Sequence, residues 1–310
     1  MSSSYLAVGY ECNHKCICCP LTTYDRLHKG LSYEEITEQM SRIKEDDGKH
    51  IVLSGGEPML HPQFLDIVKL AAEKNFNITV LSNSSQCRNA DFVNQLLGCI
   101  PIGMFNIVTA IHSSYPEIHD SITGIRGSLL ETLEGLDNLV AAGIPITVKH
   151  IFNKKSIDTL ADTFHYLEQH FPPTVAFQFC TMDYCGRANK NIKELFITMK
   201  EIQPHIEEVL DYLEQNRTVV RKVEIIESPL CMTDPYYWKY YEGPGKNLNS
   251  YIAPNNETRE ISFDVSSECQ SNYPSCEKCD VRKHCSGTWK SAYQYYGKEL
   301  LQPIQAELIK

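Results

Sequence analysis

The feature that most constrains the fold is a regular alternation of two kinds of segment, which runs from the N-terminus to about residue 226. Short apolar runs predict strands, and segments with apolar residues at helical spacing follow them. Repeated strand–helix units form a parallel sheet with right-handed crossovers, so we predict an α/β fold with about six such units. The expected strands lie at residues 5–8, 50–53, 77–81, 105–109, 146–151, 175–179 and 223–226. The expected helices lie at residues 32–44, 62–74, 92–97, 129–142, 157–169 and 192–213, and Pro204 is a candidate kink in the last one.

The chain changes character at about residue 228, where it becomes rich in Tyr, Pro, Asn and Cys and loses its apolar periodicity. A short segment without a sizeable core needs another organiser, and a bound metal can supply the missing folding energy. We therefore divide the chain into an α/β domain, residues 1–226, and a small cysteine-rich module, residues 227–310.

Charge and hydropathy exclude several classes of protein. The net charge of −10 repels nucleic acid and anionic membranes, so neither is an expected partner. The sequence has no run of about 18 apolar residues that would cross a membrane. Its first four residues lack the basic and apolar regions of a secretory signal. We therefore expect a cytoplasmic protein.

Thirteen cysteines stand in the sequence, and most of them lie in two groups. Disulfides are disfavoured in the cytosol, so grouped cysteines there indicate metal or redox chemistry. Cys12, Cys16 and Cys19 follow the first predicted strand with the spacing Cys-x3-Cys-x2-Cys, and Cys18 is off this pattern. A 4Fe–4S cluster usually takes four cysteines, so three leave one iron open, as in a catalytic metal site. The alternatives are a zinc site or thiols that bind no metal.

A second motif, Ser54-Gly55-Gly56-Glu57-Pro58, follows the second predicted strand. Two adjacent glycines allow the backbone to approach a ligand closely. The glycine carbonyls and the Glu57 carboxylate can accept hydrogen bonds from an ammonium group, and Pro58 fixes the exit toward the next helix. The alternative for this motif is a tight turn with no ligand.

Together, the three-cysteine loop and the Gly-Gly-Glu-Pro turn resemble the radical S-adenosylmethionine (SAM) superfamily, over roughly residues 5–226. The resemblance implies a partial (β/α)6 barrel with a 4Fe–4S cluster on Cys12, Cys16 and Cys19 at the C-terminal edge of the strands. It implies that the open iron binds the amino and carboxylate groups of SAM, next to the residues 55–58. It also implies a reducing partner such as flavodoxin or ferredoxin, whose electron cleaves SAM to methionine and a 5′-deoxyadenosyl radical that abstracts hydrogen from a substrate.

The same resemblance assigns further residues by their position in the chain. Ser82 and Asn83 end the third strand, where this superfamily often supplies polar groups to SAM, although a capped strand end is the alternative. His112 ends the fourth strand, where it contacts SAM or substrate unless it is only a packing residue. Cys185 precedes a Gly-Arg-Ala turn after the sixth strand, where its thiol would return a hydrogen atom to a product radical. The alternative for Cys185 is a buried small hydrophobe.

The tail contains a second cysteine motif, Cys276-x2-Cys279-x5-Cys285. It resembles part of the SPASM and twitch modules of radical SAM enzymes, which hold auxiliary clusters. The full SPASM pattern expects a cysteine where this chain has Trp289, so we expect one auxiliary 4Fe–4S cluster rather than two. Cys231 is the preferred fourth ligand because a predicted strand precedes it, and Cys269 is the competitor. A structural zinc site is the alternative.

The auxiliary module implies modification of a ribosomally made peptide, such as a crosslink, an epimerisation or an oxidation. Only four residues precede the first predicted strand, so we expect no N-terminal leader-binding domain. One alternative is the oxidation or dehydrogenation of a small molecule such as a sugar or cyclitol. Another, from a different class, is a non-catalytic iron–sulfur or zinc protein, which would need no ammonium-binding turn.

Overall fold

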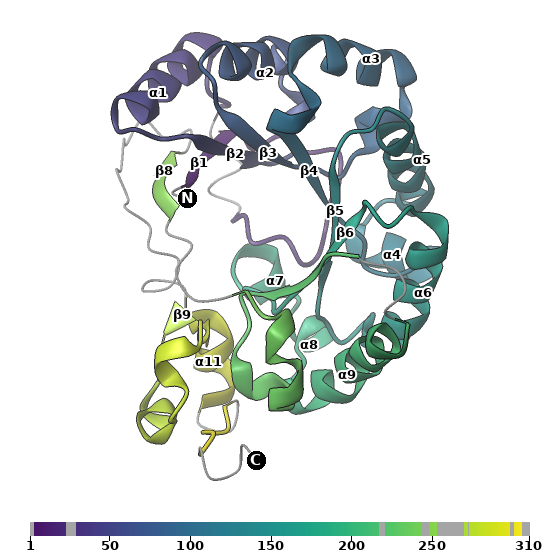
Figure 1. Cartoon of the computed structure of the whole chain (residues 1–310), viewed down its shortest axis with the longest axis vertical. Helices are drawn as coiled ribbons and strands as arrows, with labels where there is room; N and C mark the ends of the chain where they lie inside the picture. The colour runs from purple at the N-terminus through teal and green to yellow at the C-terminus, as the bar shows by residue number, and fades with distance from the viewer. Residues whose placement is uncertain are drawn as a thin grey trace.

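The computed structural model describes residues 3–22, 29–216, 221–242, 248–252, 270–271, 273–297 and 301–305. Strands and helices alternate through most of the chain, and the helices lie outside the curve that the strands form (Figure 1). The strands are β1 (Ser3–Gly9), β2 (His50–Gly55), β3 (Asn77–Leu81), β4 (Phe105–Ala110), β5 (Ile146–Ile151), β6 (Ala176–Cys180), β7 (Val223–Ile226), β8 (Leu248–Ile252), β9 (Gln270–Ser271) and β10 (Thr288–Trp289). The helices are α1 (Tyr33–Glu45), α2 (Phe64–Glu73), α3 (Ala90–Cys99), α4 (Pro116–Thr123), α5 (Ser128–Ala141), α6 (Leu160–His170), α7 (Gly186–Lys190), α8 (Ile192–Leu195), α9 (Met199–Gln215) and α11 (Lys290–Tyr296).

The main sheet contains eight strands in the order β7-β6-β5-β4-β3-β2-β1-β8. Every pair of neighbours in it is parallel. From β1 to β7 the order in the sheet follows the order in the chain, so each crossover advances one strand around the curve. Strands β7 and β8 form its two edges. This topology confirms the predicted α/β fold with a partial barrel.

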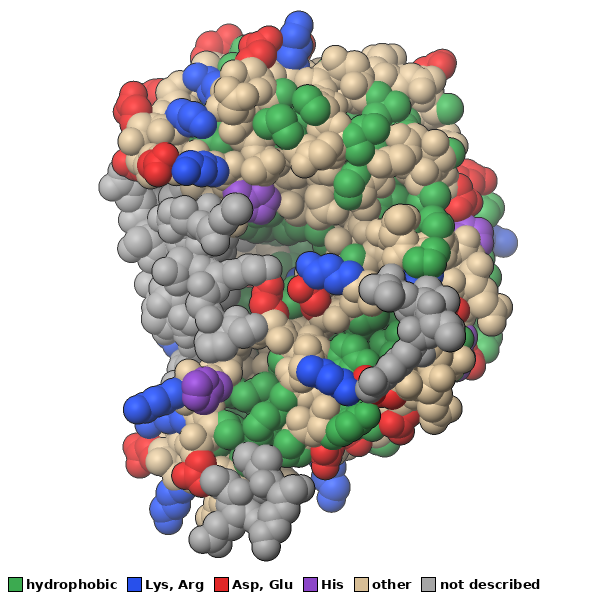
Figure 2. Space-filling model, in the orientation of Figure 1, with side chains coloured by type: hydrophobic (Ala, Val, Ile, Leu, Met, Phe, Trp, Pro, Cys, Tyr) green, Lys and Arg blue, Asp and Glu red, His purple; other side chains and the backbone are tan. Residues whose placement is uncertain are grey.

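The two faces of the sheet differ in chemistry. On the outer face, apolar side chains from neighbouring strands are in register and are buried against the helices; they include Leu6, Leu53, Val80 and Ile107. The inner face carries polar groups, among them an ion pair in which Lys149 Nζ lies 3.2 Å from Glu227 Oε2. Figure 2 shows the molecule hollowed near the centre of this view, with acidic and basic side chains beside the hollow. The outer face therefore supplies the core and leaves the inner face for a polar site.

Helix boundaries follow local capping signals. Ser32 caps α1 in a capping box with Glu35, as its sequence predicts. The single helix expected over residues 192–213 is wrong, because Thr198 forms a second capping box with Glu201 and starts α9 as a separate helix after α8. Pro204 lies inside α9 and not at the break between the two helices. None of the helices in the described ranges has both the length and the apolar character needed to span a membrane.

The segment after residue 226 contributes to both sheets of the structure. Strand β8 pairs with β1 in the main sheet, and β9 pairs with β10 in a two-stranded antiparallel sheet. The cysteine-bearing turns are short 3₁₀ helices. Trp289 Nε1 donates to Thr181 O at 3.1 Å, and Ser291 Oγ donates to Asp183 Oδ1 at 2.7 Å. These bonds fasten the tail to the chain that leaves β6.

Candidate active site

The three cysteines predicted as ligands lie on the loop that leaves β1, next to the turn that follows β2. Gly56 N donates to Gly9 O, and Glu57 N donates to Glu11 O, both at 2.7 Å. Gly55 has a φ of +121°, and a Cβ on it would lie 2.0 Å from Gly9 O. A Cβ on Gly56 would lie 2.0 Å from Glu11 O. The close approach that these two glycines permit is therefore an approach to the cysteine loop itself.

The end of helix α4 holds the part of the loop that carries Cys16. Lys15 N donates to Thr123 O at 2.8 Å. Ile17 N donates to Ile122 O at the same distance. Because these bonds lie on both sides of Cys16, they fix the backbone that presents its thiol.

The start of helix α7 holds Cys19. The carbonyl of Cys19 accepts from Arg187 N at 2.9 Å and from Ala188 N at 3.3 Å. Gly186 has a φ of +54°, and a Cβ on it would lie 2.2 Å from Pro20 O. A side chain at position 186 would therefore push α7 away from the loop. The Gly-Arg-Ala turn that the sequence singles out supports the third cysteine.

Burial and hydrogen bonds set the protonation of the loop thiols. Burial raises the pKa of the Cys12 thiol to about 11, although His14 N lies 3.4 Å from its sulfur and opposes the rise. The hydrogen bond from the Cys18 side chain is the main cause that lowers the pKa of Cys16 to about 5, and His14 adds to it. The same bond and burial raise the pKa of Cys18 well above its usual value. The lowered pKa favours the thiolate at Cys16, and the thiolate is the form that binds metals.

The donor set of the loop, three cysteine thiols, fits an iron–sulfur cluster. No three His, Cys, Asp or Glu side chains among the described residues are arranged to hold one metal ion. A zinc ion needs its sulfur ligands at about 2.3 Å from one centre. A cluster of several irons takes cysteine thiolates that stand farther apart, one on each of different irons. The loop offers three half-buried thiols as ligands for such a cluster.

The Glu57 carboxylate joins the ends of β2 and β3 and is buried, with 4% of the residue exposed. Oε1 accepts from Ser82 Oγ at 2.8 Å and from Met59 N at 3.1 Å, and Oε2 accepts from Asn83 N at 2.7 Å. Burial raises the pKa of this carboxyl group, and the three hydrogen bonds oppose the rise. A carboxylate can accept about four hydrogen bonds, so its capacity is largely used within the protein. The structure thus brings Glu57, Ser82 and Asn83 together.

Two other predicted residues lie around the loop. His112 is buried behind it, where Nε2 lies 3.8 Å from Cys18 Sγ and the backbone N–H donates to His119 Nδ1 at 3.2 Å. Burial, followed by the neighbouring His119, lowers the pKa of His112 well below its usual range, so the ring is neutral. Cys185 is exposed at the N-cap of α7. The alternative that Cys185 is a buried hydrophobe is therefore wrong.

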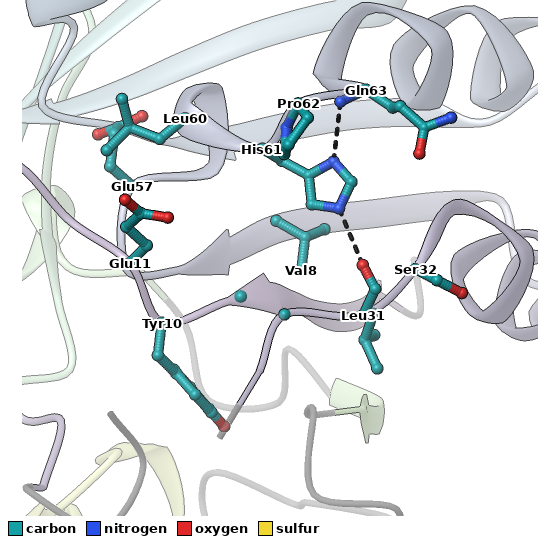
Figure 3. A pocket seen from close by; sticks show the side chains of 12 residues that line it. Val8, Tyr10, Glu11, Leu31, Ser32, Glu57, Leu60, His61, Pro62 and Gln63 are labelled. Carbon is teal, nitrogen blue, oxygen red and sulfur yellow. Dashed lines mark hydrogen bonds between the residues drawn. The ribbon is translucent and has the colours of Figure 1, made fainter. Parts of the chain in front are cut away.

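A cavity of about 330 Å³ lies beside the Gly-Gly-Glu-Pro turn, between the end of β1, residues 30–32 and residues 60–63 (Figure 3). His61 bridges two of these segments. Gln63 N donates to His61 Nδ1 at 3.2 Å, so the ring proton is on Nε2, which donates to Leu31 O at 2.8 Å. Glu11 and Glu57 also line this cavity. Sequence patterns miss it because its walls come from three separate segments.

The four tail cysteines predicted as auxiliary ligands, Cys231, Cys276, Cys279 and Cys285, line a second cavity. Burial raises the pKa of Cys231 to about 12, and the other three thiols add to the rise. Residues 301–304 complete the lining, although no motif in them predicts this role. The competitor Cys269 lies outside the described residues. The structure therefore brings the four preferred thiols to one place.

Several known proteins resemble this chain in sequence. Fe-coproporphyrin III synthase of Methanosarcina barkeri is 23% identical over 202 residues, which are 65% of this chain and 49% of that protein. The sporulation killing factor maturation protein SkfB of Bacillus subtilis is 25% identical over 200 residues, 64% of this chain and 47% of that protein. The chain thus spans about half the length of these two relatives.

The chain also resembles a solved structure in its fold and a known family in its sequence. SuiB of Streptococcus suis, in its complex with the precursor peptide SuiA, superposes with a TM-score of 0.57 at 15% identity, over 69% of this chain and 46% of that one. At that identity the likeness concerns the fold alone. Residues 6–167, from β1 into α6, match the radical SAM superfamily domain. This match covers more than half of the chain and includes both the cysteine loop and the turn that packs on it, so the chain belongs to the radical SAM superfamily.

Proposed function

We propose that this protein reductively cleaves SAM at a 4Fe–4S cluster bound by Cys12, Cys16 and Cys19. One observation carries the proposal: three half-buried thiols share a loop that the turn after β2, the end of α4 and the start of α7 hold in place. A ligand set that is fixed before the cofactor binds lowers the cost of ordering it. When bound, such a cluster supplies an electron to SAM, and the resulting 5′-deoxyadenosyl radical removes hydrogen from a substrate.

The residues around the loop have distinct roles in this proposal. The backbone of Gly55 and Gly56, with the remaining acceptor position of Glu57, holds the SAM ammonium. Pro58 fixes the exit of that turn. Ser82, Asn83 and His112 stay predictions as SAM or substrate contacts, and Cys185 stays a prediction as hydrogen donor. An electron donor such as flavodoxin or ferredoxin and a cytoplasmic location are also part of the proposal.

Reductive cleavage can be tested without knowing the substrate. The anaerobically reconstituted protein, given dithionite and SAM, should release 5′-deoxyadenosine. The triple variant Cys12→Ala/Cys16→Ala/Cys19→Ala should release none, because no loop thiol remains to bind iron. A Cys99→Ala variant, which changes a thiol outside both cysteine groups, is the matched control. Release from the triple variant at the wild-type rate would disprove the assignment.

We further propose that the substrate is a ribosomally made peptide. Support comes from SkfB, a maturation protein for a sporulation killing factor, and from the SuiB fold, described with a precursor peptide. The comparable likeness to Fe-coproporphyrin III synthase supports a small-molecule substrate, and the second candidate is the oxidation or dehydrogenation of such a molecule. Incubation with SAM and the peptide encoded by a short open reading frame beside the gene should change the peptide mass. An unchanged peptide, together with consumption of a small alcohol, would favour the second candidate.

The tail adds a separate proposal, one auxiliary 4Fe–4S cluster on Cys231, Cys276, Cys279 and Cys285. Its support is the common cavity that these thiols line. The reconstituted protein should hold about eight irons, from two four-iron clusters. Cys231→Ala should lower the content toward four, whereas Cys269→Ala should change it little. The reverse result would make Cys269 the fourth ligand in place of Cys231. Zinc in the tail would refute an auxiliary cluster.

A further inference from the structure

The first cysteine of the loop is held in a different way from the other two. Backbone hydrogen bonds to α4 and α7 flank Cys16 and fix Cys19. In the described part of the chain, no backbone–backbone bond joins residues 12–14 to another element. The residue after Cys12 instead reaches out with its side chain: Asn13 Nδ2 donates to Ser85 Oγ at 2.8 Å, and Asn13 Oδ1 accepts from Asn83 Nδ2 at 2.8 Å.

The orientation of both amides follows from the hydrogen bonds. Asn83 Oδ1 accepts from the backbone N–H of Ser85 at 3.0 Å and from Ser85 Oγ at 2.7 Å. A backbone N–H can only donate, so this end of the Asn83 amide must be the oxygen, and Nδ2 must face Asn13. Ser85 Oγ gives its one proton to Asn83 and accepts from Asn13. The three side chains close a ring of hydrogen bonds between the cysteine loop and the end of β3.

This ring is tied to the turn after β2 through Glu57. The backbone N–H of Asn83 donates to Glu57 Oε2 at 2.7 Å, and Ser82 Oγ donates to Oε1 at 2.8 Å. Ser84, which lies between Asn83 and Ser85 in the chain, is buried and has a φ of +60°. Its Oγ lies 2.6 Å from Thr109 Oγ1 on β4. A non-glycine residue held in the left-handed region indicates a turn that its surroundings fix. The support under Asn13 is therefore rigid.

We propose that Asn83 and Glu57 are positioning residues that fix the Cys12 thiol through Asn13, an inference that rests on the proposed cluster at this loop. The Asn83 amide oxygen already accepts two hydrogen bonds and one Nδ2 proton goes to Asn13, so only its second Nδ2 proton is left for the predicted SAM contact. Glu57 has a double role, since its carboxylate fixes Asn83 and borders the turn assigned to the SAM ammonium. Each cysteine then has its own support: the ends of β2 and β3 fix Cys12, α4 fixes Cys16 and α7 fixes Cys19.

The test measures the position of the thiol directly, in the full-length chain without iron under reducing conditions. N-ethylmaleimide is the probe, and mass spectrometry follows the modification of each cysteine. Asn13→Ala and Asn83→Ala should each speed the modification of Cys12 by about five- to tenfold, the factor expected from loss of one hydrogen bond. Cys16 and Cys19 should keep their rates. The double variant should be no faster than either single variant, because both substitutions break one network.

Two controls separate positioning from a general loss of stability. Asn89→Ala removes the N-cap of α3, which costs stability on the same side of the sheet but does not touch the ring. It should leave the Cys12 rate unchanged. Asn13→Asp keeps the acceptor for Asn83 Nδ2 but loses the donor to Ser85 Oγ, so its Cys12 rate should lie between those of wild type and Asn13→Ala.

After reconstitution, the Asn13→Ala and Asn83→Ala proteins should retain iron but show an altered electron paramagnetic resonance spectrum of the reduced cluster. A Cys12 rate equal to that of wild type in both variants, or equally raised in Asn89→Ala, overturns the inference. Failure of the wild type to bind iron or cleave SAM would refute the proposed cluster instead. The thiol-modification result is read independently, because it needs neither iron nor SAM.

Discussion

Cys16 and Cys19 lie in a loop whose backbone bonds reach helices more than a hundred residues away, at Thr123 and Arg187. The backbone N–H groups of three tail cysteines bond within local turns instead, and one distant bond runs from Leu230 N to Cys285 Sγ at 3.3 Å. Cys276 N donates to Tyr273 O at 2.7 Å, Cys279 N to Cys276 O at 3.0 Å and Cys285 N to Arg282 O at 3.4 Å. Distant helices thus position the barrel thiols, whereas the tail thiols lie on short turns of a segment that Trp289 and Ser291 fasten to the chain leaving β6. The difference is consistent with our proposals of a cluster whose ligands the barrel positions and of a metal that organises the tail.

The largest expected effect tests the dependence of the tail on its thiols. In the Cys276→Ala/Cys279→Ala variant, the described tail residues 273–297 should lose their protection from hydrogen exchange, since local turns alone rarely persist in water. The barrel should keep its protection, because its core lies between the sheet and the helices. Cys12→Ala/Cys16→Ala/Cys19→Ala is the converse variant and should leave both regions folded. If the tail keeps its protection from hydrogen exchange without these two cysteines, its folding does not depend on them and the proposed difference from the barrel is wrong.

A smaller effect tests how the barrel fixes Cys19. Gly186→Ala forces a Cβ to within 2.2 Å of Pro20 O at a residue with positive φ. The strain and the forced shift together should cost about 2–4 kcal/mol of unfolding free energy, measured by denaturant titration. Iron bound at the loop should fall as well. Gly98→Ala is the matched control: no atom lies within 4 Å of its added Cβ, and α3 should gain about 0.5–1 kcal/mol. Equal stabilities for the two variants would contradict the account of α7 as a support.

The smallest effect concerns the dependence of the unfolding free energy on acidic pH, which we expect to arise from buried histidines of the barrel. Burial lowers the pKa values of His119 and His150 to about 4. The unfolded imidazoles take up protons below their ordinary pKa of about 6.5, whereas the folded ones stay neutral until about pH 4. The unfolding free energy should therefore fall as pH decreases through that window.

Replacing one of these histidines should make the acid dependence shallower. His150 packs against Phe152 and Phe179, so His150→Phe keeps an aromatic ring there and removes one titrating group. The slope of unfolding free energy against pH should decrease by about one proton, measured by denaturant titration at several pH values. An equal slope in wild type and His150→Phe would show that the buried imidazole does not carry the dependence.

Much of the barrel could be predicted because its signals are local. The strands from 5–8 to 223–226 and the capping box at Ser32 are visible in short windows of sequence, and the structure contains them. Helix α4 and strand β8 are absent from the predicted elements. The first is short, and the second joins the sheet only because β1 offers it an open edge. The break before α9 does have a local signal, the Thr198 capping box, which the prediction of one continuous helix missed.

Part of the candidate site could likewise be predicted from local sequence, and part could not. The spacing of Cys12, Cys16 and Cys19 and the Gly-Gly-Glu-Pro turn are properties of the sequence alone, and they sufficed to indicate the superfamily. The structure added a contact of the two glycines with the cysteine loop, and it added Asn13 as a link to the end of β3. It also added residues 301–304 to the tail cavity.

The sequence by itself determined that strands and helices alternate and that thiols gather in two groups, because periodicity and spacing are written in neighbouring residues. Only the tertiary structure decided which element supports each cysteine. Asn13 and Asn83 stand seventy residues apart, and they meet because β1, β2 and β3 pair in parallel with their carboxyl ends at one edge of the sheet. Hydrogen bonds between such distant groups depend on strand register and on turn geometry, and neither has a pattern within a short stretch of chain.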